Sequence, residues 1–148
     1  MKSAKRPLWT CPRCGNKFVT KNLWHSCVHL DANYHFRGKN PRLKKTFKKF
    51  LAMAKRCGPI LVTHQKTRIV LQGRVRFAGI VPRKSYLLAG LSLQYPSKDK
   101  RFMKVVRYGP RWYGHYFRFE KPSDLDASWM PFIREAYQVG QQHLEIKP

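Results

Sequence analysis

Acidic residues are scarce in this chain of 148 residues, which has 31 Lys and Arg residues against 7 Asp and Glu residues. Only Asp31 and Asp99 come before residue 120, so the chain offers few pairs of carboxylates for acid–base catalysis. Long apolar runs are also missing: none approaches the roughly 20 residues that span a bilayer. The first ten residues lack the apolar segment of a secretory signal. We therefore expect a cytoplasmic protein with no membrane segment and no catalytic activity.

The usual sequence motifs of enzymes are absent as well. The chain has no G-x-S-x-G nucleophile elbow, no phosphate-binding G-x-x-x-x-G-K-S/T loop and no dinucleotide fingerprint. Hydrophobic residues make up 43% of the chain and aromatic residues 14%, which excludes a wholly disordered basic tail. Two full-sized domains do not fit in this length. The composition thus predicts one folded domain with an unusual surface.

That surface is strongly basic. The formal net charge is +24, and residues 1–119 contain 28 Lys and Arg residues against two acids. Such a surface attracts polyanions and gains affinity by releasing their condensed counterions. We therefore predict a nucleic acid, DNA or RNA, as the partner. The alternative is a protein-interaction or small-ligand-binding module whose charge serves only solubility.

Three of the four cysteines crowd the N-terminus, at Cys11, Cys14 and Cys27. In a C-x2-C-G turn two thiolates converge on one cation, while the glycine accepts a positive φ. Cys27 and either His25 or His29 would add the third sulfur and the nitrogen of a tetrahedral zinc site. A disulfide or redox pair is the alternative, but cytosolic thiols stay reduced and no thioredoxin-like pattern surrounds the turn.

Four protein ligands leave no open position on the metal, so Zn²⁺ here would be structural. It would fold a module of about 20 residues that is too small to hold a core unaided. The fourth cysteine, Cys57, lies alone near the end of a predicted helix. We expect it to be a small buried hydrophobic side chain rather than a ligand.

A helix is predicted from Pro41, with Asn40 as its N-cap and Gly58 near its end. Apolar residues recur along it at helical spacing and form one stripe. The remaining faces carry a group of lysines without nearby acids, which we interpret as a phosphate-binding surface: Lys44, Lys45, Lys48 and Lys49.

From residue 60 the pattern changes to short apolar runs separated by turn residues, which predicts β-strands. The runs cover residues 60–64, 67–72, 75–81, 85–93, 102–108 and 115–119, and a second helix is predicted over 128–139. The expected fold class is α+β. It comprises a zinc module at residues 1–30 and, at residues 31–148, a mostly antiparallel sheet of five or six strands with two main helices.

Aromatic and cationic residues are most densely mixed over residues 107–119. Alternation there predicts Phe117 and Phe119 in the core. Four residues of the segment are candidates for contacts with nucleic acid, because aromatic faces stack bases while arginines bind phosphates: Arg107, Arg111, Trp112 and Tyr113. We expect the last two in a turn bounded by glycines.

Several short motifs occur in a recognisable order over residues 9–140. They are W-x-C-P-x-C-G-x-x-F (Trp9 to Phe18), H-S-C (His25 to Cys27), H-F-x-G-K-x-P (His35 to Pro41), D-L-D (Asp124 to Asp126) and A-Y-x-x-G (Ala136 to Gly140). Together they resemble small bacterial proteins that carry the domain of unknown function 5655 behind a zinc-knuckle-like segment. The resemblance implies an α+β domain similar to the small YdhG-like bacterial domains. It also implies the ligand set Cys11, Cys14, His25 and Cys27, and it implies no activity.

Overall fold

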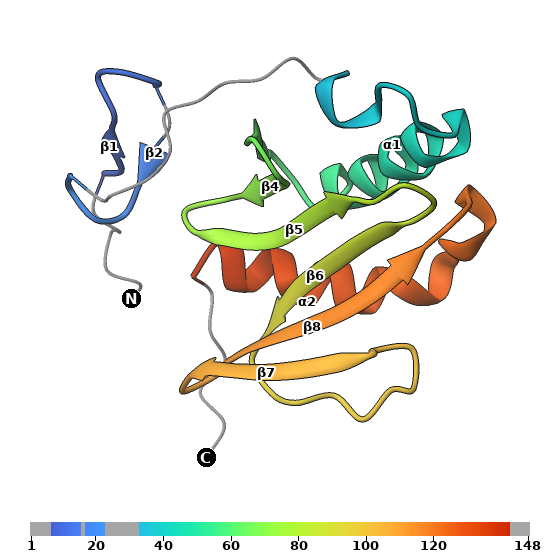
Figure 1. Cartoon of the computed structure of the whole chain (residues 1–148). Coiled ribbons are helices and arrows are strands. Elements are labelled where there is room, and N and C mark those ends of the chain that lie inside the picture. The colour runs from blue at the N-terminus through green and yellow to red at the C-terminus, as the bar shows by residue number, and fades with distance from the viewer. Residues whose placement is uncertain (1–6, 16, 23–32, 143–148) are drawn as a thin grey trace.

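The computed structural model describes residues 7–15, 17–22 and 33–142 (Figure 1). The strands are β1 (Trp9–Thr10), β2 (Lys17–Phe18), β3 (Leu61–His64), β4 (Ile69–Gln72), β5 (Arg76–Pro82), β6 (Leu87–Leu93), β7 (Lys104–Gly109) and β8 (Trp112–Phe119). The helices are α1 (Pro41–Lys55) and α2 (Met130–Gly140), with 3-10 turns at Tyr34–Phe36, Pro122–Asp124 and Ala127–Trp129. The predicted zinc ligands His25 and Cys27, and the alternative His29, lie outside the described residues.

Helix α1 begins where the sequence predicts. The side-chain oxygen Oδ1 of Asn40 accepts a hydrogen bond from the backbone N–H of Arg42 at 3.0 Å, and Pro41 occupies the first turn. The apolar stripe is buried, with Leu43 and Phe50 at most 1% exposed. After the helix, Cys57 is half-buried against the core, and burial raises the pKa of its thiol.

The main sheet is antiparallel throughout and has six strands in the order β3-β4-β5-β6-β8-β7. This confirms the predicted α+β class with its sheet and two main helices. Strand β8, rather than β7, pairs with β6. Strand β8 buries Phe117 and Phe119 toward the helices, whereas β7 carries Lys104 and Arg107 in exposed positions that suit an edge strand.

Both helices pack on the same face of this sheet, and no helix among the described residues covers the opposite face, which we call the open face (Figure 1). The core between them is rich in aromatic rings; Phe117 contacts the rings of Phe50, Phe119 and Trp129 at centroid distances of 6.5, 4.8 and 4.5 Å. Among the described residues, neither helix has the length and apolar character needed to cross a membrane.

Strand β8 starts earlier than the sequence suggests. Trp112 and Tyr113 belong to the strand, so the expectation that they lie in a turn is wrong. The turn before them is formed by Pro110 and Arg111, and Arg111 takes the left-handed φ of 56°. The chain reverses so tightly there that cross-strand pairing resumes at once, between Gly109 and Trp112.

Candidate nucleic-acid interface

The open face of the sheet is built by the alternation of side chains along its central strands. On β6, Leu87, Ala89 and Leu91 enter the core, so Leu88, Gly90 and Ser92 face the other way. The strand register then brings Val81 opposite Leu88 and Tyr116 opposite Gly90. The exposed side of the sheet centre therefore carries small and apolar side chains.

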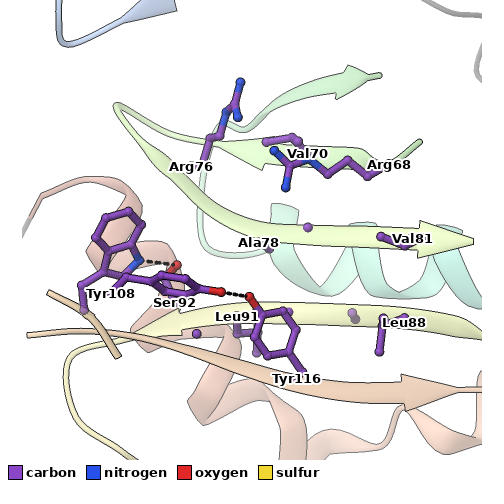
Figure 2. A pocket seen from close by; sticks show the side chains of 15 residues that line it. Arg68, Val70, Arg76, Ala78, Val81, Leu88, Leu91, Ser92, Tyr108 and Tyr116 are labelled. Atoms are coloured by element: carbon purple, nitrogen blue, oxygen red, sulfur yellow. Dashed lines mark hydrogen bonds between the residues drawn. The ribbon is translucent and has the colours of Figure 1, made fainter. Parts of the chain in front are cut away.

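A hollow of about 420 Å³ lies on this face. Figure 2 shows its two sides: Arg68, just before β4, and Arg76 on β5 form one side, and Tyr108 on β7 and Tyr116 on β8 form the other. The floor between them is apolar and includes Val70, Val81 and Leu88. No acidic side chain is among the described residues that line this hollow.

Three aromatic side chains form the side of the hollow opposite the arginines. Tyr108 is 51% exposed and Trp112 49% exposed, and their ring centroids are 5.5 Å apart at an angle of 45°. The indole N–H of Trp112 donates to the hydroxyl of Ser92 at 3.2 Å, and the hydroxyls of Tyr108 and Tyr116 are hydrogen-bonded to each other (Figure 2). Burial and this bond raise the pKa of Tyr116 to about 12, so the phenol stays neutral at physiological pH.

Two glycines make room for these rings. A Cβ atom at Gly90 would lie 3.0 Å from Cε1 of Tyr116, and one at Gly114 would lie 2.6 Å from Cε2 of Tyr108. Both distances are shorter than ordinary van der Waals contact. The absence of side chains at these two positions therefore allows the tyrosine rings to lie close against the strand surface.

The arginines of this face are held near each other without neutralising acids in the lining. Arg76 is half-buried, and desolvation, together with the positive charge of Arg68, lowers the pKa of its guanidinium. Arginine nevertheless stays protonated in proteins. A bound anion would relieve both the desolvation and the repulsion, so the pair is suited to a phosphate or another anionic group.

A second hollow, of about 520 Å³, opens beside the first. It lies between the β1–β2 hairpin, the β4–β5 turn and the β7–β8 turn, and its cationic lining residues are Arg74, Arg76 and Arg111. Arg76 and Trp112 line both hollows. On the hairpin side the wall is Phe18, Val19 and Thr20. The side-chain amide of Gln72 donates to the carbonyl of Lys17 and ties the hairpin to the main sheet.

The four predicted residues of the 107–119 segment are divided by the strand geometry. Trp112 lies on the open face, and Arg111 lines the second hollow. Tyr113 pairs with Leu93 and Arg107 across its neighbouring strands, on the face that carries the helices. Arg68, Arg76 and the two tyrosines were not predicted. Strict alternation along the strand from Trp112 would have placed Tyr116 on the same face as Trp112. The bulge that brings Tyr108 to this face has no clear sequence signal.

The four predicted lysines of α1 are also divided. Lys44, Lys45 and Lys48 surround a hollow of about 360 Å³ at the start of the helix. Lys49 instead donates to the carbonyl of Pro122 at 2.9 Å. The helix lies on the covered face of the sheet, so these lysines form a surface separate from the open face (Figure 1).

The N-terminal cysteines lie at the turn of the β1–β2 hairpin. Cys11 is 5% exposed, its carbonyl accepts the backbone N–H of Gly15 at 2.8 Å, and Gly15 has a φ of 75°. No disulfide joins the described cysteines, and no group of three or more metal-ligating side chains occurs within residues 7–15, 17–22 and 33–142. The described half of the ligand set is thus a glycine-ended C-x2-C turn, which fits zinc.

The buried histidines have structural surroundings. In His115, which is fully buried, Nε2 accepts the backbone N–H of Ser97 at 2.9 Å and Nδ1–H donates to the carbonyl of Tyr113 at 3.0 Å. His35 is 4% exposed and its ring stacks on that of His64 at 5.9 Å. Burial lowers the pKa of both His35 and His115, and the nearby His64 adds to the effect on His35.

The fold and this surface define an α+β domain with helices on one face of a six-stranded antiparallel sheet and a cationic, aromatic hollow on the other. Residues 32–140 match the family model described as Domain of unknown function (DUF5655), and the chain belongs to this family. The predicted resemblance is thereby confirmed for the domain; the N-terminal segment lies before the matched residues. No curated protein and no solved structure matches the chain.

Proposed function

We propose that this protein binds nucleic acid through the open face of its sheet and catalyses no reaction. The observation that carries the proposal is the hollow itself: Arg68 and Arg76 stand along one side and exposed aromatic rings along the other, with no acid among the described lining residues. Cations for phosphates and rings for bases are the two recognition elements that nucleic-acid binders combine. The net charge of +24 favours the same partner.

We also propose that Cys11, Cys14, His25 and Cys27 bind a structural Zn²⁺ ion. The turn geometry at Gly15 supports the first two ligands. A zinc ion held by four protein ligands would stabilise the hairpin that forms one wall of the second hollow. It would not take part in chemistry.

A small-ligand-binding module is the second candidate. The apolar floor and the volume of about 420 Å³ are within the range of small-molecule sites. The two functions differ in salt dependence, because binding of a polyanion releases counterions and binding of an apolar ligand does not.

The test is fluorescence anisotropy of nuclease-treated protein with labelled single-stranded DNA, duplex DNA and RNA over a salt series. Binding of at least one form, with a dissociation constant on the order of micromolar and a log–log salt slope of several phosphates, is expected. Two variants with the same change in charge locate the contact: Arg68→Gln/Arg76→Gln and Lys45→Gln/Lys48→Gln.

The arginine pair should lose more affinity than the exposed lysine pair, since its side chains line the hollow. Equal losses would show that the contact is not confined to the open face. No binding of any of the three forms would refute the proposed function and favour a small ligand or a protein partner.

A further inference from the structure

The two hollows lie next to each other, and we refer to them together as the cationic track. They share Arg76 and Trp112, so the lining of one passes directly into the lining of the other. Arg68 stands in the first hollow only and Arg111 in the second only. Arginines are therefore spaced along the track, from the sheet centre to the side of the β1–β2 hairpin.

The exposed rings of the track are suited to bases that are not stacked in a duplex. In a double helix the faces of the bases are covered by their neighbours, and a protein meets only phosphates and the edges of the grooves. Tyr108 and Trp112 are each about half exposed, and their ring faces can stack only on a base that is not covered by its neighbours. The apolar floor beside these rings likewise makes no favourable contact with the phosphates of a duplex.

We infer that the ligand of this surface is a single-stranded nucleic acid that lies along both hollows, with bases on the Tyr108–Trp112 side and phosphates on the arginines. The inference rests on the proposed function and adds the strandedness of the ligand and its path. It also assigns a binding role to the hairpin, because Val19 and Thr20 form the far wall of the track. The first hollow is the stacking segment and the second is an extension that only a longer strand reaches.

The length of the ligand therefore separates the two segments. Full-length protein is titrated with labelled oligothymidylates and oligouridylates of about 4 to 16 nucleotides and with a duplex of the longest sequence. We expect the affinity to rise with length until the second hollow is filled and the duplex to bind at least tenfold more weakly than the longest single strand. Tighter binding of the oligothymidylates would indicate a DNA ligand, and tighter binding of the oligouridylates would indicate an RNA ligand.

Single-arginine variants with the same charge change then test the path. Arg68→Gln should weaken short and long strands alike, by about tenfold for a lost charge-assisted hydrogen bond. Arg111→Gln should weaken only the long strands and reduce their salt slope by about 0.7. Because Arg111 has a left-handed backbone, Arg111→Gly is the second variant, and it removes the same charge without strain.

The hairpin wall is tested by Val19→Glu, which places an acid at an exposed position of the second hollow. It should weaken long strands and leave short strands unchanged. Equal or tighter binding of the duplex would overturn the single-strand inference while the proposed function stands. Equal effects of Arg111→Gly on short and long strands would overturn the path. Failure of all nucleic acids to bind would overturn the proposed function as well.

Discussion

The glycine beneath the tyrosine pair offers a sharp test of how this surface is built. Replacing Gly114 with alanine adds one methyl group 2.6 Å from Cε2 of Tyr108 and 3.2 Å from the nearest atoms of Tyr116. Tyr108 is 51% exposed and has room to swing into solvent, whereas the half-buried Tyr116 needs to shift by only a few tenths of an ångström. The substitution should therefore expel the Tyr108 ring and leave the fold intact.

The expected change in the free energy of unfolding is small. Loss of the hydrogen bond between the hydroxyls of Tyr108 and Tyr116 costs about 1 kcal/mol. Alanine in place of glycine within a strand regains roughly 0.5–1 kcal/mol of chain entropy. The net effect should stay below about 1 kcal/mol. Loss of one stacking ring should instead cost about 1–3 kcal/mol of binding, a fall in affinity of about 5- to 150-fold.

Gly140→Ala is the matched control for steric strain. Its added methyl group would lie 2.5 Å from Cδ1 of Phe77, and Phe77 is 1% exposed and has no room to move away. Overpacking of this kind costs about 1–3 kcal/mol. The two variants should therefore have opposite profiles: Gly114→Ala is stable but binds weakly, and Gly140→Ala is destabilised.

Urea denaturation followed by circular dichroism measures the stabilities, and anisotropy with a single-stranded oligonucleotide measures the affinities. The double variant Gly114→Ala/Tyr108→Ala should bind like Tyr108→Ala alone, because both changes remove the same ring. Wild-type affinity of Gly114→Ala together with weak binding of Tyr108→Ala would refute the steric reasoning. Wild-type affinity of both variants would show that Tyr108 does not stack a base.

Two further predictions concern metal and pH. The purified chain should contain one zinc per molecule by elemental analysis, and Cys14→Ser should lose the zinc while the six-stranded sheet stays folded. A metal-free wild type would contradict the proposed zinc site. The folded-state pKa values of His35 and His115 are lowered, so below a pH of about 6.5 the unfolded chain binds protons that the folded chain does not. The free energy of unfolding should therefore be highest above this pH and should fall below it, by up to about 1.4 kcal/mol per pH unit for each histidine. Urea denaturation at pH 7.5 and 5.5 measures this difference, and the loss of stability at the lower pH should be smaller for His115→Gln. Equal stabilities of the wild type at the two pH values would contradict the prediction.

Much of the fold was predictable because local signals agreed with tertiary packing. Asn40 and Pro41 mark the start of α1, and Pro131 lies in the first turn of α2, where a proline is tolerated. The alternation over residues 115–119 correctly assigned Phe117 and Phe119 to the core. These features depend on residues within a few positions of each other, so a single sequence contains the information.

The candidate site was only partly predictable, for a related reason. The basic and aromatic surroundings of Trp112 mark it as a candidate, but the sequence predicts a turn there because glycines flank the residue at positions 109 and 114, whereas Trp112 begins β8. Gly114 instead allows the close approach of Tyr108, and the tight reversal is made by Arg111 in its left-handed conformation. A glycine in a strand and a glycine in a turn look the same in sequence until the residue packed against it is known.

The sequence by itself determined the charge excess, the start of α1 and the two-residue alternation that places Phe117 and Phe119 in the core. Only the tertiary structure decided which residues of different strands come together on the open face. Arg68 and Arg76 come to share a hollow with Trp112 because β4 and β5 lie in the same sheet as β8. Tyr108 joins them because β7 folds back outside β8 with a bulge after Arg107. Strand pairing joins residues far apart in the chain, and its register is set by burial of the whole sheet rather than by any local segment.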